Sequence, residues 1–214
     1  MRERYRAVPF AATGPYPCCV PRNARDRLLD AAEELFYAQG TRATGIEQIL
    51  QTSGVGRASF YRHFASKDDL VLAYLERRTT VWSEGFVPEV RRRGGHPLVV
   101  FDLLAERLET TGYRGCSFIN TLVELPDPDD RAHRSAVEHK EQMRAFFADL
   151  LAEHGYRDDD GSLARRLLML YDGASVTGVR ERSPRAAHDA RSVAELILAA
   201  APRVAAAAEV TAGA

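Results

Sequence analysis

The residues best suited to chemistry in this sequence are a group of cations and hydrogen-bond donors between positions 57 and 67. Arg57 opens the group, Tyr61, Arg62 and His63 follow about one helical turn later, and Lys67 closes it. Arginine can donate two hydrogen bonds to the edge of a guanine, and lysine, histidine and tyrosine can donate to phosphate oxygens. These residue types therefore indicate binding of nucleic acid.

A short helix, a tight turn and a second short helix are expected to position this group. Thr44 is predicted to cap the first helix, and Ser53 and Gly54 to form the turn. Val55 should be buried directly after the turn, and Gly56 should open the second helix. This order is typical of a helix-turn-helix motif, whose second helix enters the major groove of DNA.

The second helix is predicted to have a buried side and an exposed side. Phe60 and Phe64 are spaced at i and i+4, which places both on the side that faces the protein. Near the start of the helix, we expect Arg57 to contact guanine and its neighbours to contact a thymine methyl group or a base edge. The outward side chains are then Arg57, Ala58, Ser59, Tyr61, Arg62 and His63.

Composition limits what the rest of the chain can be. Its 214 residues are 45% hydrophobic, which is enough for one domain or for a small head with a larger body. A formal net charge of −1 excludes a polycation, so contact with nucleic acid must be local. No run approaches the roughly 20 apolar residues of a membrane span, and the N-terminus lacks the apolar core of a signal peptide. We therefore expect a cytoplasmic protein.

The cysteine and histidine spacings do not indicate a metal site or a disulfide framework. Cys18 and Cys19 are adjacent in a proline-rich stretch and Cys116 stands alone, so reduced thiols are expected. His63 has no histidine or cysteine at a ligand spacing. No nucleophile, base and orienting group stand at a recognisable spacing, so we expect no metal, no cofactor and no enzymatic activity.

Helical periodicity covers most of the chain. One amphipathic helix begins at Arg22 and ends before Gly40, and Ser66 with Asp69 forms a capping box that opens a long helix reaching Val90. The absence of strand alternation predicts an all-α fold. Further helices are expected from Pro97, over the apolar segment 116–125 that should be buried all round, over 129–154, and from Ser162 and Pro184.

The segment from Ala24 to Leu70 resembles the DNA-binding domain of TetR-family transcriptional regulators. The resemblance implies that Tyr61, His63 and Lys67 hold phosphates and that Arg57, Ser59 and Arg62 meet bases. The matching residues are the DAAEELF of the first helix, then Gly40, Thr44, Ile49, Gly54, Val55, Phe60, Tyr61, His63, Phe64, Lys67 and Leu70.

Two residues depart from the family pattern at the starts of the two motif helices. Gly45 and Gly56 stand where the family commonly has hydroxyl side chains. Backbone amides at the same helix ends can replace hydroxyl contacts to phosphate. The predicted DNA contacts therefore include Thr44, Gly45, Gly56 and Ala58 as well as the side chains named above.

The resemblance also implies an organisation for the whole chain. It divides into an arm at 1–21, the three-helix DNA-binding domain at 22–68, a six-helix ligand-binding and dimerisation domain at 69–201, and a flexible tail at 202–214. The arm is expected to be disordered, and its arginines either touch a minor groove or are idle. The last two helices carry more apolar surface than one body requires, so we expect a homodimer joined through Leu167, Leu168, Tyr171, Val176, Leu196 and Ile197.

A ligand pocket is expected within the body. The segment 115–125, GCSFINTLVEL, is similar to part of some family ligand-binding domains, and Asn120 draws attention because a buried amide needs a partner. An aromatic stripe at helical spacing also fits a plain core. The predicted lining residues are Trp82, Phe86, Phe101, Cys116, Phe118, Asn120, Glu124, Phe147 and Tyr171.

The function implied is that of a ligand-responsive regulator. In the mechanism expected for the family, a small molecule binds the body when its helices spread, and this pulls on the long helix. The separation of the two heads then changes, and the protein leaves its palindromic operator. Oxidation of Cys116 is an alternative switch, and activation is an alternative to repression. The expected partners are double-stranded DNA, a small-molecule effector and a second copy of the chain.

Overall fold

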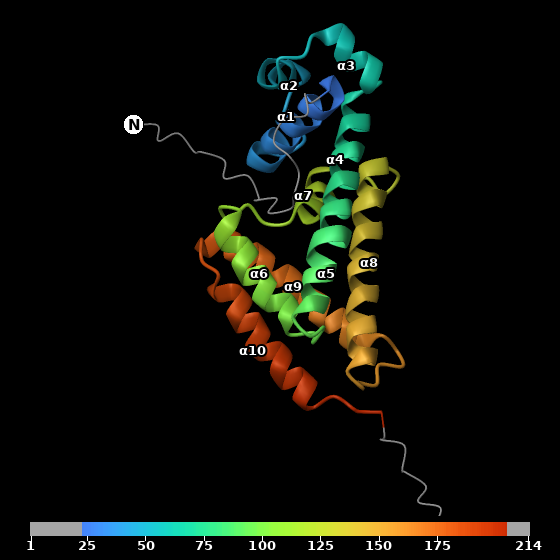
Figure 1. The fold of residues 1–214 in the computed structure, drawn as a ribbon, viewed down its shortest axis with the longest axis vertical. Helices are drawn as coiled ribbons and strands as arrows, with labels where there is room; N and C mark the ends of the chain where they lie inside the picture. The colour runs from blue at the N-terminus through green and yellow to red at the C-terminus, as the bar shows by residue number, and fades with distance from the viewer. Residues whose placement is uncertain (1–22, 205–214) are drawn as a thin grey trace, which may run out of the picture.

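The structure, a computed structural model, describes residues 23–204 and shows a head and a body joined by one long helix (Figure 1). The head lies at one end of the elongated molecule, and the helices of the body lie around the far half of the long helix (Figure 1). The predictions for the arm at 1–21 and for most of the tail lie outside the described residues.

The head is a three-helix unit closed by the start of the long helix. Phe60 and Phe64 are buried against the first helix, as their spacing predicts, and Val55 is buried between the second and third helices. Gly54 has a φ of 63°, the left-handed conformation that glycine adopts without strain. The helices are α1 (Ala24–Gln39), α2 (Ile46–Ser53) and α3 (Arg57–His63).

The predicted cap of α2 is wrong by one residue. Gly45 is the N-cap, and its N–H donates to the Gln48 side chain at 3.3 Å. Thr44 is fully buried and donates its hydroxyl to the Gly40 carbonyl at 2.7 Å. The buried hydroxyl must find an acceptor inside the protein, and that requirement turns it away from the helix end.

The long helix runs as predicted from the Ser66 cap to residue 92, but it contains one wide π turn. Ser66 accepts a hydrogen bond from the Asp69 N–H at 3.1 Å, which completes the expected cap. Pro88 has no N–H to donate to the preceding turn, and there the Val87 N–H bonds to the Trp82 carbonyl five residues back. The three parts are α4 (Lys67–Val81), η1 (Trp82–Phe86) and α5 (Val87–Arg92).

The body packs its helices around a core of aliphatic and aromatic side chains. Phe101, Phe147 and Tyr171 meet in this core, with ring centroids 6.1 to 6.5 Å apart. Helix α8 lies along α4, and α10 packs against α6 and α9 (Figure 1). The helices are α6 (Val99–Thr110), α7 (Ser117–Glu124), α8 (Arg131–Glu153), α9 (Ser162–Glu181) and α10 (Arg185–Ala199).

Three details of the body differ from the sequence expectations. Helix α7 is not buried all round, because Val123 is 76% exposed. The cap of α9 is Gly161 rather than Ser162, and the carboxylate of Asp158 accepts from N–H groups in its first turn. The tail does not fray at 202, because Arg203 pairs with Tyr156.

The prediction of an all-α fold is confirmed. Among residues 23–204 there is no β-strand, and an isolated bridge joins Tyr156 to Arg203. Within the same range, no helix combines the length and the apolar character that crossing a membrane requires.

Candidate nucleic-acid interface and ligand site

Helix α3 lies at the tip of the head (Figure 1), and its polar side chains are largely exposed. Arg57, Ala58, Tyr61, Arg62 and His63 are exposed. Ser59 is half-buried. This face combines donors to base edges near the helix start with donors to phosphate near its end, so it suits a major groove.

Arg57 has an ion-pair partner in the free protein. Its guanidinium contacts the carboxylate of Glu47 on α2, and the two side chains are 57% and 72% exposed. An ion pair this exposed contributes little to stability. The pair therefore holds Arg57 beside the polar side of α3. Breaking the pair so that Arg57 can contact a DNA base should cost little free energy.

Lys67 is more deeply engaged than the sequence suggests. Its ammonium group donates to the carbonyls of Thr41 and Thr44 at 3.0 and 3.1 Å, and so it ties the loop before α2 to the start of α4. An ammonium group has three protons, so one remains for a phosphate. Thr44 itself offers no hydroxyl to DNA, which argues against the contact predicted for its side chain.

The two glycines at the helix starts are exposed, and a Cβ at either position would meet no atom. The Gly45 amide already donates to Gln48 in the free protein. Gly56, the N-cap of α3, leaves the start of the recognition helix open to close approach by a phosphate.

Helix α7 bonds to the head at its C-terminal end and to the long helix at its N-terminal end. At its C-terminal end, the Glu124 carboxylate accepts from the Thr41 hydroxyl at 2.7 Å and from the Arg42 N–H at 3.0 Å. At its N-terminal end, the Tyr74 hydroxyl donates to Ser117 at 2.7 Å. Gly40 is required here, because its φ is 91° and a Cβ would lie 2.4 Å from the Glu124 carboxylate.

The structure does not bring all the predicted pocket residues together. Trp82, Phe86, Phe101, Phe147 and Tyr171 lie in or against the body core. Cys116 and Phe118 belong instead to the hydrophobic cluster that continues into the head.

Two predicted pocket residues lie elsewhere. Asn120 is exposed and donates to the Arg114 carbonyl at 3.3 Å, so the prediction that it is a buried amide is wrong. Glu124 faces the head rather than a pocket. The apolar neighbours in sequence suggested burial, but only one side of this short helix is covered.

A group of buried polar residues meets where α6, α8 and α9 approach the start of α7. Lys140 on α8 is 8% exposed and pairs with Asp172 on α9 at 2.6 Å. Arg107 on α6 has a buried Nη2 atom without a hydrogen-bond partner. Burial opposes ionisation of the Cys116 thiol, yet the positive charges of Lys140 and Arg107 hold its pKa below the usual value.

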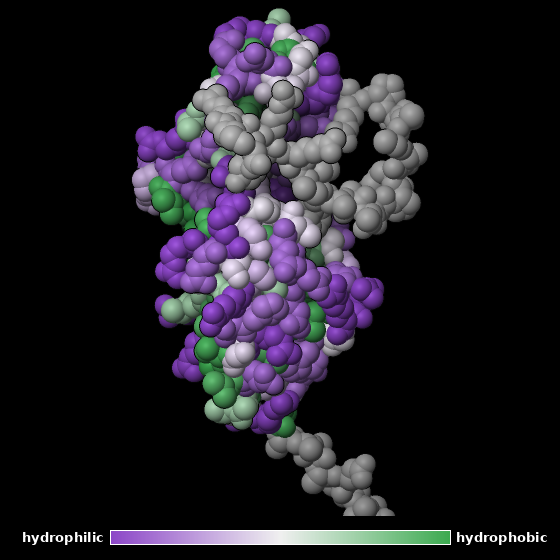
Figure 2. Space-filling view, turned by 90° about the vertical axis from the view of Figure 1, so that its left-hand side faces the viewer, coloured by the Kyte–Doolittle hydropathy of each residue, from purple (hydrophilic) through white to green (hydrophobic). Residues whose placement is uncertain are grey.

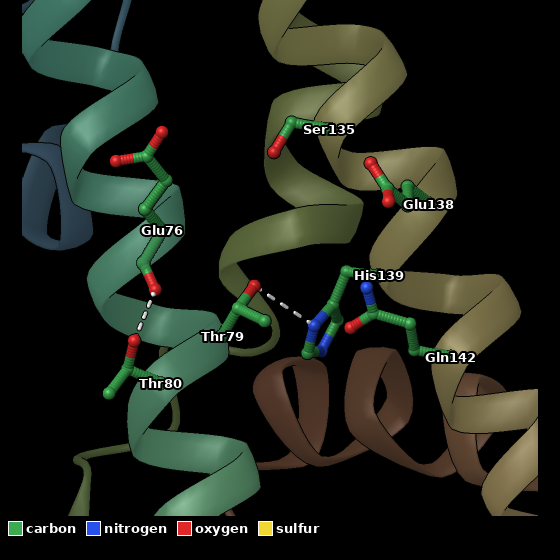
Figure 3. A pocket seen from close by; sticks show the side chains of 7 residues that line it. All are labelled: Glu76, Thr79, Thr80, Ser135, Glu138, His139 and Gln142. Carbon is green, nitrogen blue, oxygen red and sulfur yellow. Dashed lines mark hydrogen bonds between the residues drawn. The ribbon is translucent and has the colours of Figure 1, made fainter.

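His139 connects this group to a surface pocket of about 290 Å³ between α4 and α8 (Figure 3). Its ring lies 3.5 Å from the Phe118 ring, stacked on it, and meets the Trp82 ring edge-to-face at 5.2 Å. Burial, then Lys140 and Arg107, lower the pKa of His139 to about 3, so the imidazole is neutral. Its Nδ1 lies 3.2 Å from the hydroxyl of Thr79, as the dashed line in Figure 3 shows.

Sequence reasoning missed Arg107, His139, Lys140 and Asp172. The only available signal was one charged residue on the apolar side of each helix, and such residues are usually solvated. Their significance depends on four helices meeting, which helical periodicity does not reveal.

The predicted dimer contacts divide between the core and the surface. Leu167 and Tyr171 are buried within the body, so they cannot form the outer face of an interface as predicted. Leu168 and Ile197 are half-buried, while Val176 and Leu196 are 54% and 72% exposed. The exposed apolar residues of α9 and α10 are Met169, Val176, Val179, Val193 and Leu196.

On the face shown in Figure 2, apolar atoms reach the surface in patches along the body. The head in the same view is mostly hydrophilic, with a few apolar atoms (Figure 2).

Comparison with known proteins agrees with this geometry. The family model described as bacterial regulatory proteins, tetR family, matches residues 28–74, from α1 into α4. The chain is 34% identical to SCO4454, a TetR-family transcriptional regulator from Streptomyces coelicolor, over 82% of this chain and 94% of that structure, with a TM-score of 0.75. The chain belongs to the TetR family.

Two curated relatives, both HTH-type transcriptional regulators, extend the comparison. The regulator TcmR of Streptomyces glaucescens is 40% identical over 79 residues, which cover 36% of this chain and 33% of TcmR. An HTH-type regulator in the lacX 3' region of Lactococcus lactis subsp. lactis is 26% identical over 134 residues, 60% of this chain and 65% of the relative. The chain thus spans less than two thirds of these curated relatives.

Membership in the TetR family defines the general function. The family consists of helix-turn-helix transcriptional regulators and not of enzymes, so the chain is a DNA-binding transcriptional regulator without enzymatic activity. The polar side of α3 is its candidate DNA surface.

Proposed function

We propose that this TetR-family protein is a repressor that binds a palindromic operator as a homodimer and leaves it when a small molecule binds the body. The main support is the direct connection between body and head: Glu124 on α7 holds the loop that Lys67 also holds. A change in the body that moves α7 would therefore alter the hydrogen bonds that hold the loop before α2 in the DNA-binding motif.

The dimer is proposed to form through α9 and α10. The five exposed apolar residues named above recur on two neighbouring helices, and apolar side chains gathered in this way mark an interaction surface. Pairing of the same surface on two copies gives two-fold symmetry, and a two-fold dimer reads an inverted repeat.

Release requires that the ligand prefer one arrangement of the helices. A ligand with equal affinity for the DNA-binding and the released arrangement does not shift the equilibrium between them. In the free protein α7 bonds to the head through Glu124 and to the long helix through Ser117, and the long helix passes the body core at the π turn. A ligand that spreads α4 from α8 would alter both connections and change the separation of the two heads.

The test is an in vitro selection of bound DNA from a random duplex library with the full chain. An inverted repeat should be enriched. A mismatched base pair in a half-site typically costs about 1–3 kcal/mol of binding free energy, and the Arg57→Ala variant should lose less than this at the base pair that Arg57 contacts. Glu47→Ala serves as the control, because it frees Arg57 without removing it. Enrichment of no sequence, or of unpaired half-sites only, would count against the proposal.

A second candidate function, regulation by oxidation of Cys116, is favoured by the charges around this thiol. Lys140 and Arg107 lower its pKa against the effect of burial, and a thiolate is the form that attacks peroxide. The sulfur would take one peroxide oxygen as sulfenate, and the other oxygen would leave as water. Operator affinity after peroxide treatment should fall for the native protein and not for Cys116→Ser; equal responses would exclude the thiol as the sensor.

A further inference from the structure

The buried polar group of the body carries more positive than negative charge. Arg107 and Lys140 are cations, Asp172 is the carboxylate paired with Lys140, and His139 is neutral. Arg78, the further cation that acts on His139, is already paired with Glu33 at 3.1 Å. Arg107 is half-buried, and among residues 23–204 no carboxylate pairs with it, so an added anion could supply a direct partner for its guanidinium while the Cys116 thiol stays neutral.

Hydrogen bonding points in the same direction. Among residues 23–204, three buried side-chain atoms have no hydrogen-bond partner, and two of them belong to this region: Arg107 Nη2 and Trp82 Nε1. Both groups are donors only. Because Arg107 Nη2 bonds to no sulfur or oxygen of the protein, Cys116 does not satisfy it.

The surroundings of these donors are aromatic. Trp82 meets His139 and Phe146 edge-to-face, at centroid distances of 5.2 and 5.8 Å. Phe118 stacks on His139, and Lys140 lies 6.0 Å above the ring of Tyr171. A flat aromatic body fits between such rings, while its charged end meets the cations.

The pocket between α4 and α8 adjoins this region through His139. Figure 3 shows His139 reaching from α8 toward Thr79 on α4, and this side chain lines the pocket. The His139 ring contacts Trp82 and Phe118 and is held at the pocket by its contact with Thr79. His139 is therefore the residue shared by the pocket lining and the buried polar group.

We propose that the effector is a small aromatic anion, such as an aromatic carboxylate, bound between α4, α6 and α8 with its charge on Arg107 and Lys140. This inference rests on the proposed ligand-responsive function and adds the chemical class of the ligand. The anion supplies the acceptors that Arg107 and Trp82 lack, and it stacks where His139 now lies.

The test uses Trp82, the single tryptophan of the chain, as a fluorescent reporter in the full-length protein without DNA. Benzoate and 1-naphthoate are titrated beside their neutral amides, benzamide and 1-naphthamide, at constant ionic strength. At least one carboxylate should bind saturably and about tenfold or more tightly than its amide, because a charge-assisted hydrogen bond is stronger than a neutral one. If neither carboxylate binds more tightly than its amide, the inference is wrong.

Variants then locate the site. Arg107→Met should remove the preference for carboxylate over amide, Arg107→Lys should keep part of it, and Arg144→Gln should leave it unchanged, because Arg144 pairs with Glu141 at the surface. The melting temperature of free Arg107→Met should not fall, since the replaced guanidinium has an unsatisfied donor in the free protein. A preference that survives Arg107→Met would overturn the inference.

Operator release is measured separately on the selected DNA. If carboxylates bind at Arg107 without releasing DNA, the binding site is supported and the proposed regulation fails. If a neutral compound releases DNA and no carboxylate is preferred, the regulation is supported and the anion site is wrong.

Discussion

At the scale of single residues, the side chains that suit DNA also have partners within the free head. Lys67 bonds to two carbonyls, and Arg57 contacts Glu47. These contacts restrict the side chains before DNA arrives, which lowers the entropy lost on binding. A substitution at Lys67 should therefore change both the stability of the head and its affinity for DNA, whereas one at Arg57 should change mainly the affinity.

Lys67→Ala should weaken binding to all DNA sequences and reduce the slope of log affinity against log salt by about one phosphate contact. Loss of the two bonds to Thr41 and Thr44 should also lower the free energy of unfolding by roughly 1–3 kcal/mol. Salt-dependent DNA binding and urea unfolding measure the two effects. A loss of stability with an unchanged salt dependence of DNA binding would show that Lys67 only stabilises the loop before α2 and does not contact phosphate.

His139→Gln should change how stability depends on pH. The pKa of His139 is about 3 in the folded protein against an ordinary value of 6.5, so the unfolded chain binds the proton first as pH falls. The free energy of unfolding that depends on neutral His139 is fully present above pH 6.5. It is lost as pH falls from about 6.5 to 3, by up to about 1.4 kcal/mol per pH unit. Urea unfolding of both proteins at pH 7.5 and 5 should show a smaller loss for His139→Gln; an equal loss would contradict this.

At the scale of helices, two elements join the head to the body. The long helix does so covalently, and α7 does so through the hydrogen bonds of Glu124, while its other end bonds to the long helix. The π turn places Trp82 and Phe86 against the body core at the midpoint of the long helix. The turn lies directly before Pro88, which cannot donate the hydrogen bond that a regular helix would need there.

Glu124→Gln should loosen α7 from the head. The amide keeps the size of the carboxylate but weakens its bonds from Thr41 and Arg42, so the free energy of unfolding should fall by about 1–2 kcal/mol. Operator affinity of the ligand-free protein should fall with it. Glu109→Gln, at an exposed carboxylate on α6, is the control and should change neither quantity. Equal unfolding curves for Glu124→Gln and native protein would exclude the connection.

At the scale of the whole molecule, the body has an inner and an outer apolar surface. Leu167 and Tyr171 complete the inner core, while Val176 and Leu196 stay outside it. A hydrophobic side chain at the surface of a stable monomer is ordinary, but a set of them on two packed helices is not. This outer surface is where we expect the second copy.

Leu196→Glu should convert the proposed dimer to a monomer, because pairing through α9 and α10 would bury the added charges at the interface. Light scattering after size-exclusion chromatography measures the mass, and affinity for the selected palindrome should fall steeply. Val123→Glu is a matched control, since Val123 is 76% exposed on α7, away from the proposed interface. A dimer that persists in Leu196→Glu would place the interface elsewhere.

Local patterns were sufficient to predict the helices and the polar side of α3. The i and i+4 spacing of Phe60 and Phe64, and the cap formed by Ser66 and Asp69, depend on neighbours within one helical turn. The period of a helix therefore predicted which residues of the motif face inward. It also predicted the all-α fold, since nearly every segment repeats its apolar residues at that period.

Tertiary packing alone decided which surface covers each helix. Periodicity identifies an apolar side but not its partner, so Leu167 and Tyr171 were assigned to a dimer although the body's own core covers them. Likewise, Arg107 on α6 and Lys140 on α8 are far apart in sequence and became one site only when their helices packed together. The polar side of α3 depends on one helix and could be predicted from the sequence, whereas the proposed anion site depends on contacts among several helices.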